Sequence, residues 1–275
     1  MLCIRPFADA DVQFGMRLKE QAGWNQLEGD WRRMLDMQPD GCFVAQFDGA
    51  AAGTCMTCIF GDVAWIAMML VEQSLRGKGI GRALMEHALG FLDGRGTGTI
   101  RLDATPMGQP LYEKLGFQAE YSLARYAGKP TGCQRPSGAH RHTRDCDELV
   151  YSLDRSVTGC DRRKLLKRLI DERDCWVVGG SPLRGYLLTR AGSRATQIGP
   201  CIADDIAGPV LLNHAFDQHS ESPIYIDIPL SHQPAAALAR EEGLTAQRQL
   251  LRMCRGRRVD EQVERLWASS GPELG

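Results

Sequence analysis

A glycine-rich stretch, SLRGKGIGRALM at residues 74–85, restricts the fold more than any other part of the sequence. The apolar run MMLV ends shortly before it, and the residues that follow place Ile80, Leu84, Ala88 and Phe91 at helical spacing. A strand therefore passes into a helix through a short loop of glycines. The first N–H groups of a helix have no partner within the helix, and the helix dipole is positive at this end. The pattern predicts an anion site at the start of this helix.

The residues around this turn are predicted to form a mixed α/β unit that ends near Tyr126. Turn signals at Asp48-Gly49 and Gly61-Asp62 divide the apolar stretch before the loop into three antiparallel strands. Pro110 and Gly116 mark the start and the end of a short helix after the loop. The expected order is a strand at 2–6, helices at 9–23 and 27–37, three strands within 41–71, the helix after the loop, a strand at 98–105, the short helix, and a strand at 117–126.

The second half of the chain echoes the first. A stretch rich in Gly, Pro, Arg and His follows Tyr126 and reads as a linker. After it, helical and strand patterns alternate again, and IDIPLSHQPAAALAREEGL (226–244) resembles LDATPMGQPLYEKLGF (102–117) in element order and ending. We therefore expect two copies of one fold, with domains at 1–126 and 148–256, a linker at 127–147 and a C-terminal tail at 257–275.

Composition favours a small-molecule partner. The net charge of -1 gives no general attraction to nucleic acid or to a membrane surface, and we expect neither as a partner. The start of the sequence lacks the apolar core of a signal peptide, no apolar run reaches membrane-spanning length, and the ten cysteines are scattered. These features predict a cytoplasmic protein.

Two groups of cysteines and histidines are candidates for a metal site. Cys55 and Cys58 have C-x-x-C spacing but lie on an expected strand, where side chains three apart point to opposite faces. Cys133, His140, His142 and Cys146 match no familiar zinc spacing. We expect no metal, and the alternative for the second group is zinc.

The glycine loop does not fit two common nucleotide signatures. It lacks the Gly-Lys-Ser/Thr of a Walker A loop, and Arg82 and Leu84 break the pattern G-x-G-x-x-G. It reads R-x-x-G-x-G from Arg76 to Gly81, and LYEKLGF follows at 111–117 on the next strand–helix unit. With these two motifs, residues 2–126 resemble the GNAT superfamily of N-acetyltransferases, whose loop of this kind binds acyl-CoA.

The resemblance implies a site for acetyl-CoA in the first copy. Glycines allow the backbone to approach the pyrophosphate, and three basic side chains surround it. The pantetheine arm can pair with the backbone edge of residues 69–71 as an added strand would. The expected cofactor-binding residues are Met69, Leu70, Val71, Arg76, Gly77, Lys78, Gly79, Ile80, Gly81, Arg82, Thr105, Gly108, Tyr112 and Lys114.

The resemblance also assigns a role to Tyr112. The tyrosine of LYEKLGF lies near the acetyl sulfur in the family, so Tyr112 is the expected general acid for the leaving thiolate. The alternative is a core aromatic that packs its helix against the sheet. The family often has Asn seven residues and Ala four residues before this tyrosine, where this chain has Thr105 and Gly108.

The base and the acceptor site are less constrained. Glu28 and Asp103 are the main candidates for the base, beside Asp30 and Glu72, and each can equally be a solvated carboxylate. Trp24 and Asn25 lie between the first two expected helices, where the family builds its acceptor site, and we expect both to contact substrate.

The second copy lacks the cofactor motifs. Its loop reads ADDIAGP where the first copy has LRGKGIG, and Ala239 stands at the position of Tyr112. We therefore expect one active copy and one degenerate copy that shapes or covers the acceptor site. The expected function is acetyl transfer from acetyl-CoA to a primary amine of a small molecule, an acyltransferase activity of the EC 2.3.1 type. The alternatives are an inactive acyl-CoA sensor and a partner-binding scaffold, and the sequence leaves the oligomeric state open.

Overall fold

The computed structural model describes residues 1–132 and 138–275. Its helices are α1 (Val12–Gln21), α2 (Glu28–Met37), α3 (Ile80–Gly94), α4 (Gln109–Lys114), α5 (Asp147–Thr158), α6 (Arg163–Glu172), α7 (Ala207–Gln218) and α8 (Gln233–Glu241). Its strands are β1 (Leu2–Pro6), β2 (Cys42–Phe47), β3 (Ala50–Phe60), β4 (Val63–Val71), β5 (Thr99–Ala104), β6 (Gln118–Gly128), β7 (His140–Arg141), β8 (Cys175–Gly179), β9 (Leu183–Arg190), β10 (Thr196–Ala203), β11 (Ile224–Pro229), β12 (Thr245–Gly256) and β13 (Leu266–Ala268).

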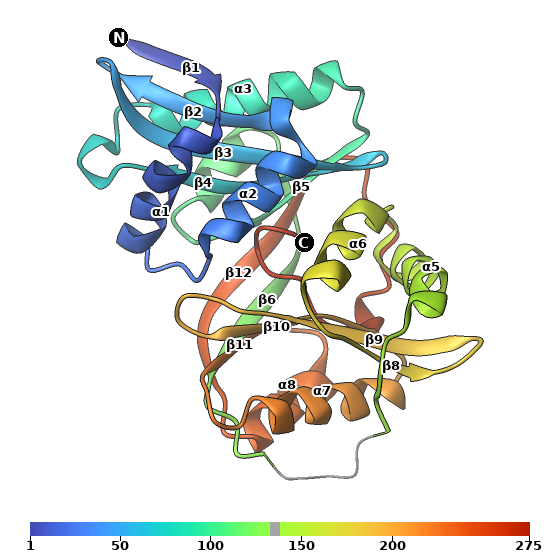
Figure 1. Cartoon of the computed structure of the whole chain (residues 1–275). Helices are drawn as coiled ribbons and strands as arrows, with labels where there is room; N and C mark the ends of the chain where they lie inside the picture. The colour runs from blue at the N-terminus through green and yellow to red at the C-terminus, as the bar shows by residue number, and fades with distance from the viewer. Residues whose placement is uncertain (133–137) are drawn as a thin grey trace.

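All described strands belong to one mixed sheet, which confirms the predicted fold class. The order is β1-β2-β3-β4-β5-β12-β6-β11-β10-β9-β8-β7, and β13 pairs with β10. Strand β4 runs parallel to β5, and β10 runs parallel to β11, while the remaining pairs are antiparallel. The two halves of the chain form an upper and a lower lobe in Figure 1.

The two halves exchange their closing strands. Strand β12, from the second half, lies between β5 and β6 of the first half, with Asp103 opposite Arg252 in the β5 pairing. Strand β6 pairs on its other side with β11 of the second half. Figure 1 shows β6 and β12 side by side between the lobes. Neither half therefore completes its sheet alone, and a boundary at residue 126 or 256 does not separate two independent sheets.

Three apolar clusters hold the helices on the sheet. Helix α3 packs on one face of the upper lobe, and α7 packs with α8 on one face of the lower lobe. The third cluster joins the lobes, because Trp31 and Met34 of α2 share it with Val150 of α5 and Leu169 of α6. Helix α5 begins within the segment that was expected to be a linker.

The segment expected as a C-terminal tail is folded. Strand β13 pairs with β10, and Trp267 within it is 1 % exposed. The residues after β13 are mostly buried between the lobes, where Figure 1 places the end of the chain. The linker expected at 127–147 is also shorter than predicted, because β6 extends to Gly128 and α5 begins at Asp147. Cys133, one member of the possible zinc group, lies outside the described residues.

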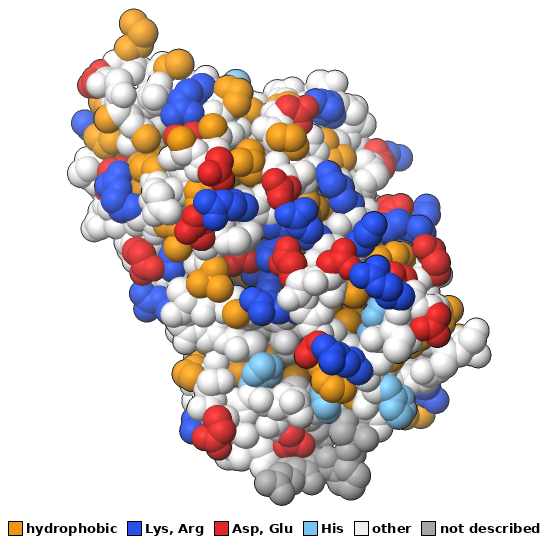
Figure 2. Space-filling view, viewed as in Figure 1, with side chains coloured by type: hydrophobic (Ala, Val, Ile, Leu, Met, Phe, Trp, Pro, Cys, Tyr) orange, Lys and Arg blue, Asp and Glu red, His pale blue; other side chains and the backbone are white. Residues whose placement is uncertain are grey.

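Basic and acidic side chains are interspersed on the face shown in Figure 2, as the net charge of -1 suggests. None of the helices in the described part of the chain has both the length and the apolar character needed to cross a bilayer.

Candidate active site

The site begins where two parallel strands separate. Strand β4 pairs with β5 only over Val63–Trp65, and beyond this point β5 continues to pair with β12. The separation coincides with an irregular backbone at Met68, which has a φ of 50° and whose carbonyl accepts a hydrogen bond of 2.7 Å from the Thr54 hydroxyl. The edge of β4 at Met69–Val71 therefore faces a cleft instead of a neighbouring strand.

This cleft contains most of the predicted cofactor-binding residues. Its lining is Gln21, Ala22, Trp24, Met69, Leu70, Val71, Leu75, Arg76, Gly77, Gly79, Ile80, Gly81, Arg82, Thr105, Pro106, Met107, Gly108, Leu111, Tyr112 and Arg248. Of the residues predicted to bind cofactor, Lys78 and Lys114 are outside this lining. Lys78 is exposed with its ammonium 5.1 Å from the centre of the Phe47 ring, and Lys114 is exposed on α4. For these two, contact with the cofactor stays a prediction from the sequence.

The glycine loop has the backbone of an anion-binding turn. Gly77 and Gly79 have φ values of 80° and 79°, which favour glycine, and a Cβ at either position would meet no atom within 4 Å. Gly79 is the N-cap of α3, so the first N–H groups of this helix open toward the same cleft. The free space in front of the two glycines and the Arg76 side chain beside them suit a pyrophosphate.

An inner chamber continues from the cleft. It is lined by Trp24, Gln26, Ile66, Ala67, Met68, Met69, Leu102, Asp103, Thr105, Tyr112, Arg248, Leu250, Pro272 and Glu273. Trp24, Met69, Thr105, Tyr112 and Arg248 line both spaces, so the two spaces meet at these residues. Four of the chamber residues come from the second half of the chain, two from β12 and two from the C-terminal segment.

Tyr112 lies at the junction of cleft and chamber. Its ring packs edge-to-face on Phe117, with ring centres 6.0 Å apart. A Cβ at Gly108 would lie 2.8 Å from Tyr112 Cε2, so glycine at this position leaves room for the ring. Burial raises the pKa of the Tyr112 phenol above its ordinary value. The hydroxyl is therefore protonated at neutral pH, as a proton donor must be.

The carboxylates predicted as bases are held by cations or lie elsewhere. Asp103 lines the chamber, but Arg252 binds it through two hydrogen bonds of 2.9 and 3.1 Å. Burial raises the pKa of Asp103, and the neighbouring Arg252 opposes this shift. Glu28 begins α2, pairs with Arg32 at 2.6 Å, and lines neither the cleft nor the chamber, so the geometry argues against it as a base.

The other two candidates also have partners. Glu72 accepts hydrogen bonds of 2.7 Å from Arg17 and from Gln21. Asp30 binds Arg33 at 2.6 Å and Arg190 at 2.8 Å. No candidate carboxylate is thus both in the chamber and free of a cationic or amide partner.

Trp24 and Asn25 have different roles in the structure. Trp24 lines both cleft and chamber, as expected for a substrate contact. The Asn25 side chain instead donates a 2.9 Å hydrogen bond to the Ala195 carbonyl and accepts bonds from the Arg194 and Ala195 amides. These bonds occupy both its oxygen and its nitrogen. We correct the prediction for Asn25: it joins the loop before α2 to the second half.

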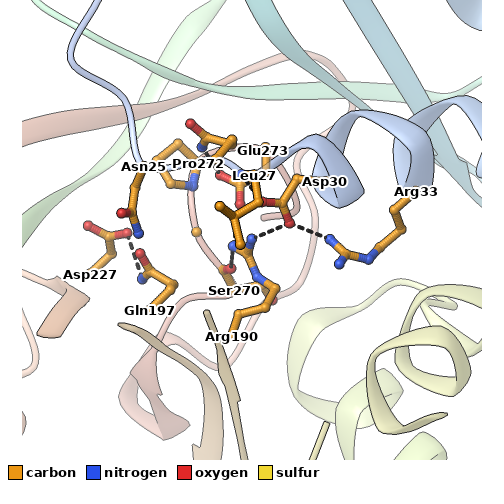
Figure 3. A network of polar contacts seen from close by, with 12 residues as sticks. Asn25, Leu27, Asp30, Arg33, Arg190, Gln197, Asp227, Ser270, Pro272 and Glu273 are labelled. Carbon is orange, nitrogen blue, oxygen red and sulfur yellow. Dashed lines mark hydrogen bonds and ion pairs between the residues drawn. The ribbon is translucent and has the colours of Figure 1, made fainter. Parts of the chain in front are cut away.

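A network of buried charges surrounds Asn25 and was not predicted. Figure 3 shows Arg190 of β9 between Asp30 of α2 and the C-terminal segment. Arg190 donates to Asp30 at 2.8 Å, to the Ser270 carbonyl at 3.1 Å, and to Glu273. Gln26 donates to the other oxygen of Glu273 at 2.8 Å. Because these partners are 80 or more residues apart along the chain, no local pattern could have indicated them.

The second half closes the corresponding cleft with its own residues. Strands β10 and β11 also separate, after Ile198, and β13 pairs with β10 beyond this point. A Cβ at Gly208, the second residue of α7, would lie 1.9 Å from Trp267 Cε2, so the indole fills the space before this helix. The Asp204 carboxylate accepts hydrogen bonds from the Ile206 and Ala207 amides, where an anion would bind.

Comparisons with known proteins match both halves to one family. Residues 13–117 match the model "Acetyltransferase (GNAT) family", and residues 150–268 match the model "Acetyltransferase (GNAT) domain". The uncharacterized N-acetyltransferase YitH of Bacillus subtilis (strain 168) is 28% identical over 233 residues, 79% of this chain and 78% of YitH. The holothin acyltransferase of Pseudoalteromonas sp. (strain SANK 73390) is 26% identical over 189 residues, 67% of this chain and 63% of that protein.

Two solved structures share the arrangement of the whole chain. A putative acetyltransferase from Pyrococcus horikoshii superposes with a TM-score of 0.88 at 23% identity and covers 100% of this chain and 96% of its own. A tandem GNAT protein from the clavulanic acid biosynthesis pathway superposes with a TM-score of 0.66 at 14% identity, over 93% and 98% of the two chains. At these identities the likeness concerns the fold.

Proposed function

Because the chain belongs to the GNAT acetyltransferases and carries two copies of the domain in tandem, we propose that its first copy transfers an acetyl group from acetyl-CoA to a primary amine of a small molecule. The observation that carries the proposal is the continuous space from the glycine loop, past Tyr112, into a chamber lined by residues of both copies.

The cleft suits coenzyme A along its length. The amides of the glycine loop and of the first turn of α3 would hold the pyrophosphate, with Arg76 and Arg82 adding positive charge. The open edge of β4 at Met69–Val71 would pair with the pantetheine amides. When bound, acetyl-CoA supplies a thioester whose carbonyl carbon accepts the amine.

Tyr112 is positioned to act on the leaving group. The amine nitrogen forms a bond to the acetyl carbon, the carbon–sulfur bond breaks, and the Tyr112 hydroxyl donates its proton to the sulfur. The amine loses one proton to solvent, and the Tyr112 phenolate regains one proton from solvent. The structure gives the chamber no free carboxylate base, so an amine with a pKa near that of an α-amino group, about 7.7, is a better acceptor than one near 10.4.

The second copy would complete the acceptor site without binding coenzyme A. Its cleft holds β13 and the Asp204 carboxylate caps its helix, while its strand β12 and its C-terminal segment line the chamber of the first copy.

Thiol release from acetyl-CoA, measured with a panel of primary amines, tests this function. We expect amine-dependent release by the full chain and none by Gly79→Glu, which puts bulk and negative charge at the pyrophosphate position. Binding of acetyl-CoA without release for any amine would favour the sensor alternative. Absence of acetyl-CoA binding would contradict the proposal and leave the scaffold alternative.

A further inference from the structure

Arg248 differs from the buried arginines around it. Arg125, Arg190 and Arg252 each pair with a buried carboxylate, with Asp227, Glu273 and Asp103 respectively. Within residues 1–132 and 138–275, the Arg248 side chain forms no ion pair or hydrogen bond, and its Nε is buried without a partner. The side chain as a whole is partly exposed and lines the cleft, while its Nε is withdrawn from water. A partly desolvated cation without a partner is costly, and a ligand can supply the missing acceptor.

The position of Arg248 is that of an acceptor contact. It extends from β12, the exchanged strand, and lines both the cofactor cleft and the inner chamber together with Trp24 and Tyr112. The acids nearest to it are already neutralised, because Arg125 holds Asp227 and Arg190 holds Glu273. Burial lowers the pKa of Arg248, and the neighbouring Arg125 adds to the shift. An anion bound here would relieve both effects.

A second residue with an unpartnered polar atom, Gln26, lines the same chamber. Gln26 uses its Nε2 to donate to Glu273, and its Oε1 is buried without a hydrogen-bond partner. This oxygen can accept a hydrogen bond from an amine or another N–H group. The chamber thus offers the Arg248 guanidinium, which can donate two parallel hydrogen bonds, and a neutral amide oxygen that can accept one. Its own carboxylates already pair with arginines.

We propose that the acceptor is an amine that also carries a carboxylate, and that Arg248 binds this carboxylate while Gln26 Oε1 accepts a hydrogen bond from the amine. This inference rests on the proposed function. A guanidinium binds a carboxylate through two parallel hydrogen bonds, which fixes the direction of the rest of the molecule. The amine is thereby directed toward Tyr112 and the thioester. The second copy supplies the selectivity of the active copy through one residue of its exchanged strand.

Matched acceptor pairs test the inference. Thiol release and calorimetric binding in the presence of coenzyme A are measured for L-amino acids and for the primary amines that lack only the carboxylate. We expect kcat/KM to be at least tenfold higher for the carboxylated member of the preferred pair. In Arg248→Met, the KM for the carboxylated acceptor should rise about 10–100-fold, which is the effect of losing a charge-assisted bidentate contact. The ratio of kcat/KM between the two members of the pair should then be close to one.

Controls separate the inference from the proposed function. Arg255→Met, on the same strand but in a partly exposed pair with Asp93, should leave the acceptor KM and the selectivity unchanged. Arg248→Lys keeps the charge without the planar fork and should recover only part of the affinity. The melting temperature of each variant reports whether it folds.

The outcomes are distinct. If amino acids bind, and bind more weakly to Arg248→Met, but no thiol is released, the transferase function is wrong and the anion site stands. If transfer occurs with equal preference for both members of every pair, the inference is overturned. It is also overturned if Arg248→Met raises the KM for acetyl-CoA and not that for the acceptor, because Arg248 would then contact the cofactor.

Discussion

Removal of the Arg190 guanidinium should weaken the contact between the two copies more than any exposed charge substitution. Arg190 is 6 % exposed and binds Asp30 of the first copy and Glu273 of the C-terminal segment. In Arg190→Met, Asp30 retains Arg33 and the Leu27 amide, but Glu273 retains only Gln26 as a side-chain partner. The substitution thus leaves the buried Glu273 carboxylate without its ion-pair partner.

The expected cost follows from this loss. Breaking one partner of a buried ion pair lowers the free energy of unfolding by about 3–5 kcal/mol. For a chain of this size, that corresponds to a fall in Tm of about 10 °C. Urea unfolding followed by tryptophan fluorescence measures the change, and thiol release should report a higher acceptor KM because Glu273 lines the chamber.

A matched variant tests the burial argument. Arg168→Met removes another contact between the copies, with Asp36, but both side chains are about half exposed. Its cost should stay below about 1 kcal/mol. Equal losses of unfolding free energy in Arg190→Met and Arg168→Met would refute the reasoning. Burial would then not determine how much an ion pair contributes to stability.

The same network predicts a pH dependence. Burial alone would raise the pKa of Asp30, but Arg190 and Arg33 hold it below its ordinary value of 3.8. A carboxyl with a lowered pKa contributes stability above its unfolded pKa, and the contribution is lost as the pH falls through the folded value. The stability difference between the native protein and Asp30→Asn should therefore shrink below about pH 3.8. A difference that grows on acidification would contradict the assignment.

Three further predictions concern Tyr112, the second copy and the exchanged strands. Tyr112→Phe should keep its affinity for acetyl-CoA and slow transfer about 10²–10⁴-fold in steady-state thiol release, and full activity would assign Tyr112 to packing. Asp204→Ala should lower the free energy of unfolding by about 1 kcal/mol, because the hydrogen bonds to the first amides of α7 are lost. It should not create a second coenzyme A site, and calorimetry that finds one would contradict the inference that β13 and Trp267 also close this cleft. A chain ending at residue 126 lacks β11 and β12, so β5 keeps only its short pairing with β4 and β6 loses both of its partners. Size-exclusion chromatography should therefore find aggregates. A stable monomer that binds acetyl-CoA would show that the first copy folds alone.

The cofactor cleft was the most predictable part of the site. Most of its residues lie within two short segments, 69–82 and 105–112. Each segment carries its own local signal: glycines with positive φ in the first, and a helix that begins after a turn in the second. The contrast between the loops LRGKGIG and ADDIAGP likewise indicated from sequence that only the first copy binds an anion at this position. The structure adds that the Asp204 carboxylate itself occupies the helix terminus.

The exchange of β6 and β12 could not be predicted from the sequence. The alternation of apolar and polar residues in a strand indicates which face is buried, but it does not identify the neighbouring strand. Both closing strands fit either copy by this criterion. The domain boundaries at 126 and 256 assumed that each strand pairs within its own copy. The exchange is the reason why a chain ending at residue 126 is expected to aggregate.

The inner chamber could not be predicted from the sequence for a related reason. Arg248 and Glu273 come from the second half, and their position beside Tyr112 depends on the exchanged strand and on the C-terminal segment. Asn25 was expected to bind substrate because an amide in a loop suits that role, but a segment 170 residues away satisfies it. Helix α5 was also missed, since its acidic start lies next to a stretch without apolar periodicity.

The division of labour between the copies is the central claim, and calorimetric titration of the full chain with coenzyme A tests it most directly. The account predicts one site per chain, lost completely in Gly79→Glu, because β13, Trp267 and Asp204 occupy the second cleft. Two sites per chain, or one site that persists in Gly79→Glu, would contradict it.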